Sequence, residues 1–149
     1  MVPPTRAEMK ARAEAFVAHL EMLREAGGGS LSAAELFSLV GAPQDSRIRQ
    51  LLESRGSLDI VFEDEHHGQF SNRGPALVIP VGPVRLHVPP KITGRVGMTG
   101  GQVTLDFDPA ETLVARVMIM EVKVKSVEVS PHHMAVRVPG GAFDQEYRF

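Results

Sequence analysis

The sequence predicts an α+β fold in which about three N-terminal helices pack on an antiparallel β-barrel or sandwich of roughly eight strands. Three observations carry this prediction. Apolar residues before Gly56 recur at helical steps, those after it alternate, and three separate turns bring apolar residues into matching register. We therefore expect a helical segment at 1–56 and a β domain at 57–149, packed as one compact unit.

The first helix is predicted to begin at a capping box and to end at a glycine triplet. Thr5 and Glu8 have the spacing at which a hydroxyl and a carboxylate satisfy the free amides of a helix N-terminus. The apolar residues that follow share one helical face: Met9, Ala13, Phe16, Val17, Leu20 and Leu23. The glycines at 27–29 then favour the left-handed backbone conformation that ends helices.

Two short helices are expected next. Ser32 and Glu35 form a second capping box for a helix that runs through Val40. Asp45 can cap a third helix, which ends at Gly56. Helices of this length are unstable alone, so we expect them to pack on the β domain.

Three β-hairpins follow from their turn residues, and each turn fixes a register. A slip of one residue would move every apolar side chain to the opposite face of the sheet. The turns at 100–101, 130–133 and 80–83 predict three facing pairs: Met98 with Val103, Val129 with Met134, and Ile79 with Val84. All three pairs are apolar, which favours an antiparallel meander. An earlier strand is expected at 58–62, with a turn at 64–68.

The segment 113–124 is predicted to be the longest strand. Between Val114 and Met120 it is apolar on both faces except at Arg116, so we expect both faces to be covered. The alternation of apolar residues changes parity near 125–126, which predicts a bulge or bend there.

Composition and charge exclude several classes of protein. The chain has 149 residues, 16 basic and 18 acidic side chains and no cysteine. A net charge of -2 argues against strong electrostatic binding of nucleic acid, and the absence of cysteine excludes a disulfide scaffold, a thiolate zinc site and a cysteine nucleophile. With neither a long apolar run nor the pattern of a secretory signal at 1–10, the sequence predicts a cytoplasmic protein without a membrane span.

The densest polar run, at 63–67, is the candidate metal site. Carboxylates and imidazoles bind zinc, manganese or iron, but neighbouring strand residues point to opposite faces, so a turn would be needed to bring them together. The candidate ligands are Asp64, Glu65, His66 and His67. A second histidine pair, at 132–133, would matter if the fold brought it close. The alternative is a solvated hairpin tip.

No catalytic residue or cofactor is predicted. Glycines at 94, 97, 100 and 101 precede a predicted strand rather than the helix that phosphate-cradling loops require, so they indicate curvature of the sheet. Asp106 and Asp108 alternate onto one face, but acidic residues before a proline turn are usually solvated or capping groups.

A winged helix at 32–55 is an alternative function. Arg47, Arg49 and Gln50 would lie on its recognition helix, where such side chains read guanine and adenine. The charge balance opposes this hypothesis, because residues 1–56 contain seven basic and seven acidic side chains. A metal-dependent enzyme that uses the run at 63–67 is a second alternative.

The leading hypothesis is a non-enzymatic binding or interaction module. Its strands are rich in aliphatic residues and methionine, whose flexible side chain adapts to irregular apolar partners. Such a surface can hold a hydrophobic small molecule or a partner subunit, including a second copy of the chain. The candidate contact residues are Met98, Met118, Met120, Met134, Phe143, Tyr147 and Phe149.

Overall fold

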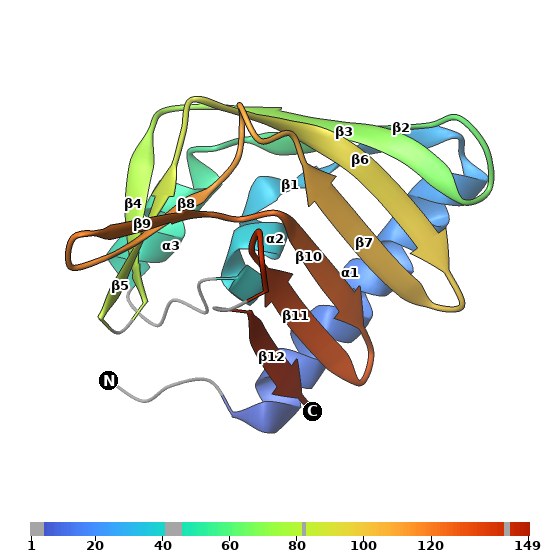
Figure 1. Ribbon diagram of the computed structural model, residues 1–149. Coiled ribbons are helices and arrows are strands. Elements are labelled where there is room, and N and C mark those ends of the chain that lie inside the picture. Colours follow the sequence, from blue (N-terminus) through green and yellow to red (C-terminus); the bar gives the residue numbers. More distant parts are fainter. Residues whose placement is uncertain (1–4, 41–45, 82, 142–143) are drawn as a thin grey trace.

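The computed structural model describes residues 5–40, 46–81, 83–141 and 144–149. These residues form three helices and twelve strands in two antiparallel sheets, which confirms the α+β class (Figure 1). The helices are α1 (Arg6–Glu25), α2 (Ala33–Val40) and α3 (Ser46–Glu53). The large sheet contains, in spatial order, β1 (Gly28–Ser32), β2 (Ser57–Phe62), β3 (His67–Arg73), β6 (Lys91–Thr99), β7 (Gln102–Phe107), β10 (Ser126–Ser130), β11 (His133–Arg137) and β12 (Gln145–Arg148). The small sheet contains β4 (Leu77–Val81), β5 (Val84–Val88), β8 (Val114–Val117) and β9 (Met120–Lys123).

The closed barrel is a wrong expectation. The large sheet has two open edges, β1 and β12, and the described strands outnumber the roughly eight expected. Both sheets are antiparallel throughout, and short connections join most neighbouring strands.

The long helix α1 covers the inner face of the large sheet (Figure 1). At its N-terminus the Thr5 hydroxyl oxygen accepts a hydrogen bond from the Glu8 amide at 3.1 Å, as the capping box predicts. The predicted apolar face is buried at Ala13, Phe16, Val17 and Leu20, and the helix packs against β1, β7, β10 and β11. A single buried apolar cluster includes residues of α1 and α2 and of both sheets.

Two of the three predicted registers are confirmed. Met98 lies opposite Val103, and Val129 lies opposite Met134. The third is wrong by two residues, because Ile79 lies opposite Leu86 rather than Val84. β4 continues through Pro80 to Val81, which an edge strand tolerates since a proline there removes no hydrogen bond needed by a neighbouring strand. An even shift keeps the same side chains on the same face, so the apolar pattern did not reveal it.

The expected long strand at 113–124 is also wrong. The chain turns back after Val117 and forms a hairpin of β8 and β9, with Val117 opposite Met120. The two-residue loop is Met118–Ile119, which contains none of the glycine, proline, asparagine or aspartate residues that usually mark a turn. Beyond the hairpin, where a bulge or bend is expected near 125–126, β9 ends at Lys123 and β10 begins at Ser126, and the chain passes there from the small sheet to the large one.

The glycine triplet does more than end α1. Residues from Gly28 onward form β1, an edge strand paired with β2, which the sequence did not predict. A Cβ atom on Gly28 would lie 2.6 Å from the Ile60 carbonyl oxygen, so the close approach of the two strands requires glycine at that position. Within the described part of the chain, no helix is long and apolar enough to cross a membrane.

Candidate functional site

The candidate contact residues fall into two groups that the sequence did not separate. Met98 and Met134 are each 1% exposed and belong to the buried apolar core. Phe149 is partly buried against the same core. Tyr147 is half-exposed on the edge strand β12, and Phe143 lies outside the described residues. Met98, Met134 and Phe149 therefore offer little surface for a partner, whereas the Tyr147 side chain stays partly accessible at the edge of the large sheet.

Met118 and Met120 belong to the other group, at the tip of the β8–β9 hairpin. Met118 is 96% exposed and Met120 is 46% exposed. Between them lies Ile119, which is fully exposed and which the sequence analysis did not single out. Exposed apolar residues are common when scattered singly, but three consecutive ones at the end of a hairpin form a continuous apolar tip. We call Met118, Ile119 and Met120 the hairpin tip.

The backbone of the hairpin tip is strained at Met118. Its φ is +55°, and it is the only described residue other than glycine with a positive φ. A positive φ at the first of two loop residues is the pattern of a type II′ turn, in which glycine is preferred. The β6–β7 hairpin follows that preference, since both of its loop residues, Gly100 and Gly101, are glycine. The β8–β9 hairpin instead carries a large apolar side chain at a position that disfavours one.

Replacing Met118 with glycine is expected to raise the free energy of unfolding by about 0.5 kcal/mol. Relief of the left-handed conformation gains about 1 kcal/mol, and the greater freedom of glycine in the unfolded chain offsets part of that gain. Urea unfolding measures the difference. The control is Met22→Gly, at an exposed methionine inside α1, which should cost about 1 kcal/mol. An equal decrease in the free energy of unfolding in the two variants would contradict backbone strain at Met118.

Charged side chains lie on the strands that carry the hairpin tip. Arg116, two residues before the loop, pairs with Glu121 across the hairpin at 3.4 Å. On its other side Arg116 lies in register with Arg85 of β5, whose side chain forms no ion pair or hydrogen bond with any described residue. The Lys123 ammonium group donates to the Pro109 carbonyl oxygen at 3.0 Å. Two arginines as cross-strand neighbours repel each other, so the outer face of the small sheet is locally electropositive.

The acidic and histidine run forms a capped turn between β2 and β3. The Asp64 carboxylate accepts hydrogen bonds from the amides of His66 and His67, at 2.7 and 2.8 Å. The His66 ring lies 3.1 Å from the Met98 carbonyl oxygen, and Glu65 is exposed. In the described ranges, no three histidine, aspartate or glutamate side chains gather in a way that could hold a metal ion. The second histidine pair lies on a different hairpin, between β10 and β11.

The hydrogen bonds of Asp64 predict a pH-dependent stability. The amide of His66, with smaller contributions from His67, holds the pKa of Asp64 below its usual value. The stabilisation is therefore present above the unfolded pKa, near 4, and is lost as the pH falls through the lower folded pKa. Asp64→Ala should be less stable than the natural chain at pH 7, with the difference shrinking in acid.

Urea unfolding between pH 7 and pH 2.5 tests this pH dependence. Glu65→Ala is the matched control, because it removes a neighbouring exposed carboxylate and should leave stability unchanged at every pH. If the difference in free energy of unfolding between the natural chain and Asp64→Ala stays constant down to pH 2.5, the ionised Asp64 carboxylate does not stabilise the turn.

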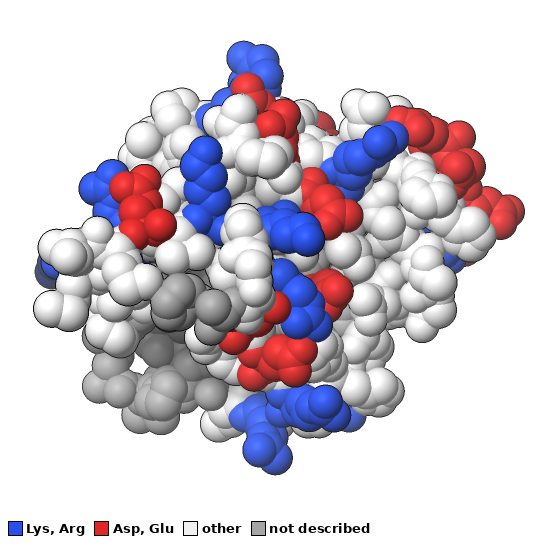
Figure 2. All heavy atoms as spheres, viewed as in Figure 1, with Lys and Arg blue, Asp and Glu red and all other residues white. Residues whose placement is uncertain are grey.

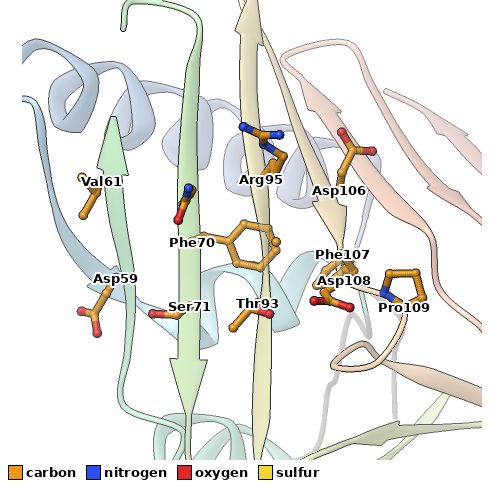
Figure 3. A pocket seen from close by; sticks show the side chains of 12 residues that line it. Asp59, Val61, Phe70, Ser71, Thr93, Arg95, Asp106, Phe107, Asp108 and Pro109 are labelled. Atoms are coloured by element: carbon orange, nitrogen blue, oxygen red, sulfur yellow. The ribbon is translucent and has the colours of Figure 1, made fainter. Parts of the chain in front are cut away.

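A groove of about 760 Å³ runs over the outer face of β2, β3, β6 and β7. Figure 3 shows Asp59, Ser71, Thr93 and Asp108 in a row across these strands. Their polar groups bond locally: Asp59 accepts from the Ser57 hydroxyl at 3.1 Å, and Thr93 bonds to a Glu111 carboxylate oxygen at 2.7 Å.

The predicted carboxylate pair, Asp106 and Asp108, also lies in this groove. Asp108 accepts from the Ala110 amide at 2.9 Å, as expected of an acidic residue that caps a turn. The possible DNA-reading residues Arg49 and Gln50 are exposed on α3, and α3 packs against α2.

Arg55 is an important residue that the sequence analysis counted only as a charge. Its side chain is 0% exposed and follows the end of α3. Nε donates to the Asn72 side-chain oxygen at 3.0 Å, and Nη1 donates to the carbonyl oxygens of Gly74, Pro75 and Pro89 at 3.0, 3.0 and 2.7 Å. Burial lowers the pKa of Arg55. These carbonyls lie just before β4 and just after β5, so Arg55 holds two of the four connections between the sheets, those on either side of the β4–β5 hairpin.

Comparisons with known proteins do not assign a function to this site. No protein-family model, curated protein or solved structure matches the chain. The residues and their geometry therefore carry the functional inference.

Proposed function

We propose that this protein is a non-enzymatic interaction module that docks on an apolar surface through its hairpin tip. The observation that carries this proposal is the almost complete exposure of two adjacent apolar side chains, Met118 and Ile119. The backbone strain at Met118 adds support, because the sequence keeps a large side chain where glycine would be more stable.

The interior of the fold favours a surface contact over an enclosed ligand. The inner face of the large sheet is filled by its own side chains, such as Leu105 and Val127, and by Phe16 and Leu20 of α1, all of which are buried. A hydrophobic small molecule between helix and sheet would have to displace part of this packed core. The hairpin tip, in contrast, is available without any rearrangement.

The energy of such a contact fits reversible docking. Complete burial of a methionine or isoleucine side chain contributes about 1.5–3 kcal/mol. Two or three such residues contribute about 3–9 kcal/mol, which is comparable to the loss of translational and rotational freedom on association, about 4–15 kcal/mol. The hairpin tip therefore supports a weak contact that additional interactions strengthen.

A titration with dodecyl maltoside micelles tests the proposal by NMR spectroscopy of the full chain. Amide signals should shift at 117–120, and these shifts should vanish in the double variant Met118→Gln with Ile119→Gln. The matched control replaces two exposed apolar residues elsewhere, Met22→Gln with Val61→Gln, and should keep the shifts. Shifts confined to β12 or α1, or unchanged shifts in the tip variant, would overturn the assignment of the hairpin tip as the docking element.

A further inference from the structure

We infer that the apolar surface is an anionic phospholipid bilayer, whose interface the hairpin tip enters. This inference rests on the proposed function and names the kind of surface that the same site binds. Three features of the small sheet lead to it: the size of the exposed apolar surface, the charge beside it and its shape.

The exposed apolar surface is too small for a stable interface with a second copy of the chain. Among the described residues of the small sheet, the large exposed apolar side chains are those of Val78, Met118, Ile119 and Met120. A standard protein interface uses about 20–30 residues on each side. A bilayer needs no complementary pocket, because its acyl chains surround single apolar side chains that enter the interface.

The outer groove of a second copy does not complement the hairpin tip either. Its lining carries four charged side chains, the carboxylates of Asp59, Asp106 and Asp108 and the guanidinium group of Arg95. Burying the apolar tip there would remove water from these charged groups without offering them new partners.

The charge near the hairpin tip complements anionic headgroups. The four strands of the small sheet carry Arg85, Arg116 and Lys123 against a single carboxylate, that of Glu121, whereas the whole chain has a net charge of -2. Glu121 pairs with Arg116, and Arg85 has no ionic partner among the described residues. Basic side chains beside an inserted apolar segment are attracted to a negatively charged leaflet.

The shape of the hairpin suits insertion. β8 and β9 extend to the left-hand extremity of the molecule, where the chain turns (Figure 1). Figure 2 shows this extremity as a largely uncharged protrusion, with charged side chains set back from it. The unbranched thioether of Met118 adapts readily to disordered acyl chains. The tip can therefore enter the interface while Arg85 and Arg116 remain at the level of the headgroups.

Vesicle flotation with the full chain tests the inference. Vesicles of phosphatidylcholine alone are compared with vesicles that also contain phosphatidylglycerol, at low salt. The natural chain should float with the anionic vesicles, and its partition coefficient should fall at least about tenfold in the variant Met118→Gln with Ile119→Gln. Arg85→Gln should lower it about fivefold, and added salt should weaken binding.

Two controls match these variants. The variant Met22→Gln with Val61→Gln removes two exposed apolar side chains outside the small sheet, and Arg24→Gln removes a positive charge on α1. Both should bind anionic vesicles like the natural chain. All these substitutions lie at the surface, and urea unfolding confirms that each variant is folded before its binding is compared.

The outcomes separate this inference from the proposed function. Equal binding to both vesicle types, or equal loss of binding in the controls, overturns the assignment to anionic lipid. Absence of vesicle binding, with micelle shifts still localised at 117–120, overturns the lipid assignment alone. In that case we would measure the oligomeric state by sedimentation velocity. Dimers of the natural chain that are absent in the tip variant would identify a second copy as the partner. Absence of both vesicle binding and localised micelle shifts overturns the inference and the proposed function together.

Discussion

Replacing Arg55 with leucine is expected to lower the free energy of unfolding by about 3 kcal/mol, one of the two largest single-residue effects that we expect in this fold. The leucine removes one hydrogen bond to Asn72 and three to backbone carbonyls. Those acceptors stay where they are, and each buried acceptor left without a donor costs about 1–3 kcal/mol. The expected loss of stability is smaller than the sum of these costs. Nη2 of Arg55 is itself buried without a hydrogen-bond partner, and the leucine removes the cost of burying it.

Urea unfolding measures the effect of this substitution. Arg73→Leu is the matched control, since Arg73 is exposed on β3 next to Asn72 and its side chain forms no hydrogen bond or ion pair with the described residues. It should change stability by less than about 0.5 kcal/mol. Similar effects of the two substitutions would show that the buried hydrogen bonds of Arg55 do not stabilise the fold.

The loss of Arg55 should also affect the hairpin tip from a distance. Arg55 connects the end of α3 to Gly74 and Pro75, which lead into β4, and to Pro89, which follows β5. Since β5 pairs with β8, these contacts set the position of the sheet that carries the tip. Hydrogen exchange in Arg55→Leu should therefore increase in β4 and β5 more than in the β6–β7 hairpin.

The sequence predicted those elements whose signals are local. A capping box placed the start of α1 correctly, and paired glycines at 100–101 set the register of β6 and β7. The hairpin at 118–119 was missed, because its turn uses Met118 in a conformation that normally calls for glycine. The segment 114–120 is apolar except at Arg116 and was therefore interpreted as a strand covered on both faces, whereas Met118, Ile119 and Met120 are exposed.

The candidate site was predicted only in part, because the sequence pattern does not show which apolar residues are buried. Methionine in an alternating pattern identifies a strand but does not say whether its face is covered. Met98 and Met134 are therefore core residues, although Met118 and Met120 carry the same sequence signal. Arg55 was missed because a buried arginine that bonds to backbone carbonyls looks, in sequence, like any surface charge.

Replacing Gly94 with alanine is expected to cost about 3 kcal/mol or more, because it places a methyl group where no space exists. A Cβ atom at Gly94 would overlap the carbonyl oxygen of Asp106 on β7, and it would lie 2.7 Å from the ring of Phe70. That ring packs edge-on against Phe107, with 5.3 Å between ring centroids, so it cannot move aside freely. The Asp106 carbonyl oxygen belongs to β7, which pairs with β6, so the overlap can be removed only if these two strands of the sheet move relative to each other.

Gly97→Ala is the matched control for this prediction, on the same strand. A Cβ atom at Gly97 would meet nothing closer than the His66 carbonyl oxygen at 4.0 Å, and the backbone there does not require glycine. Urea unfolding should therefore show Gly97→Ala close to the natural chain, while Gly94→Ala is strongly destabilised. The sequence analysis treated both glycines as one signal of curvature. Equal stability of the two variants would support that simpler interpretation and contradict a specific close contact at Gly94.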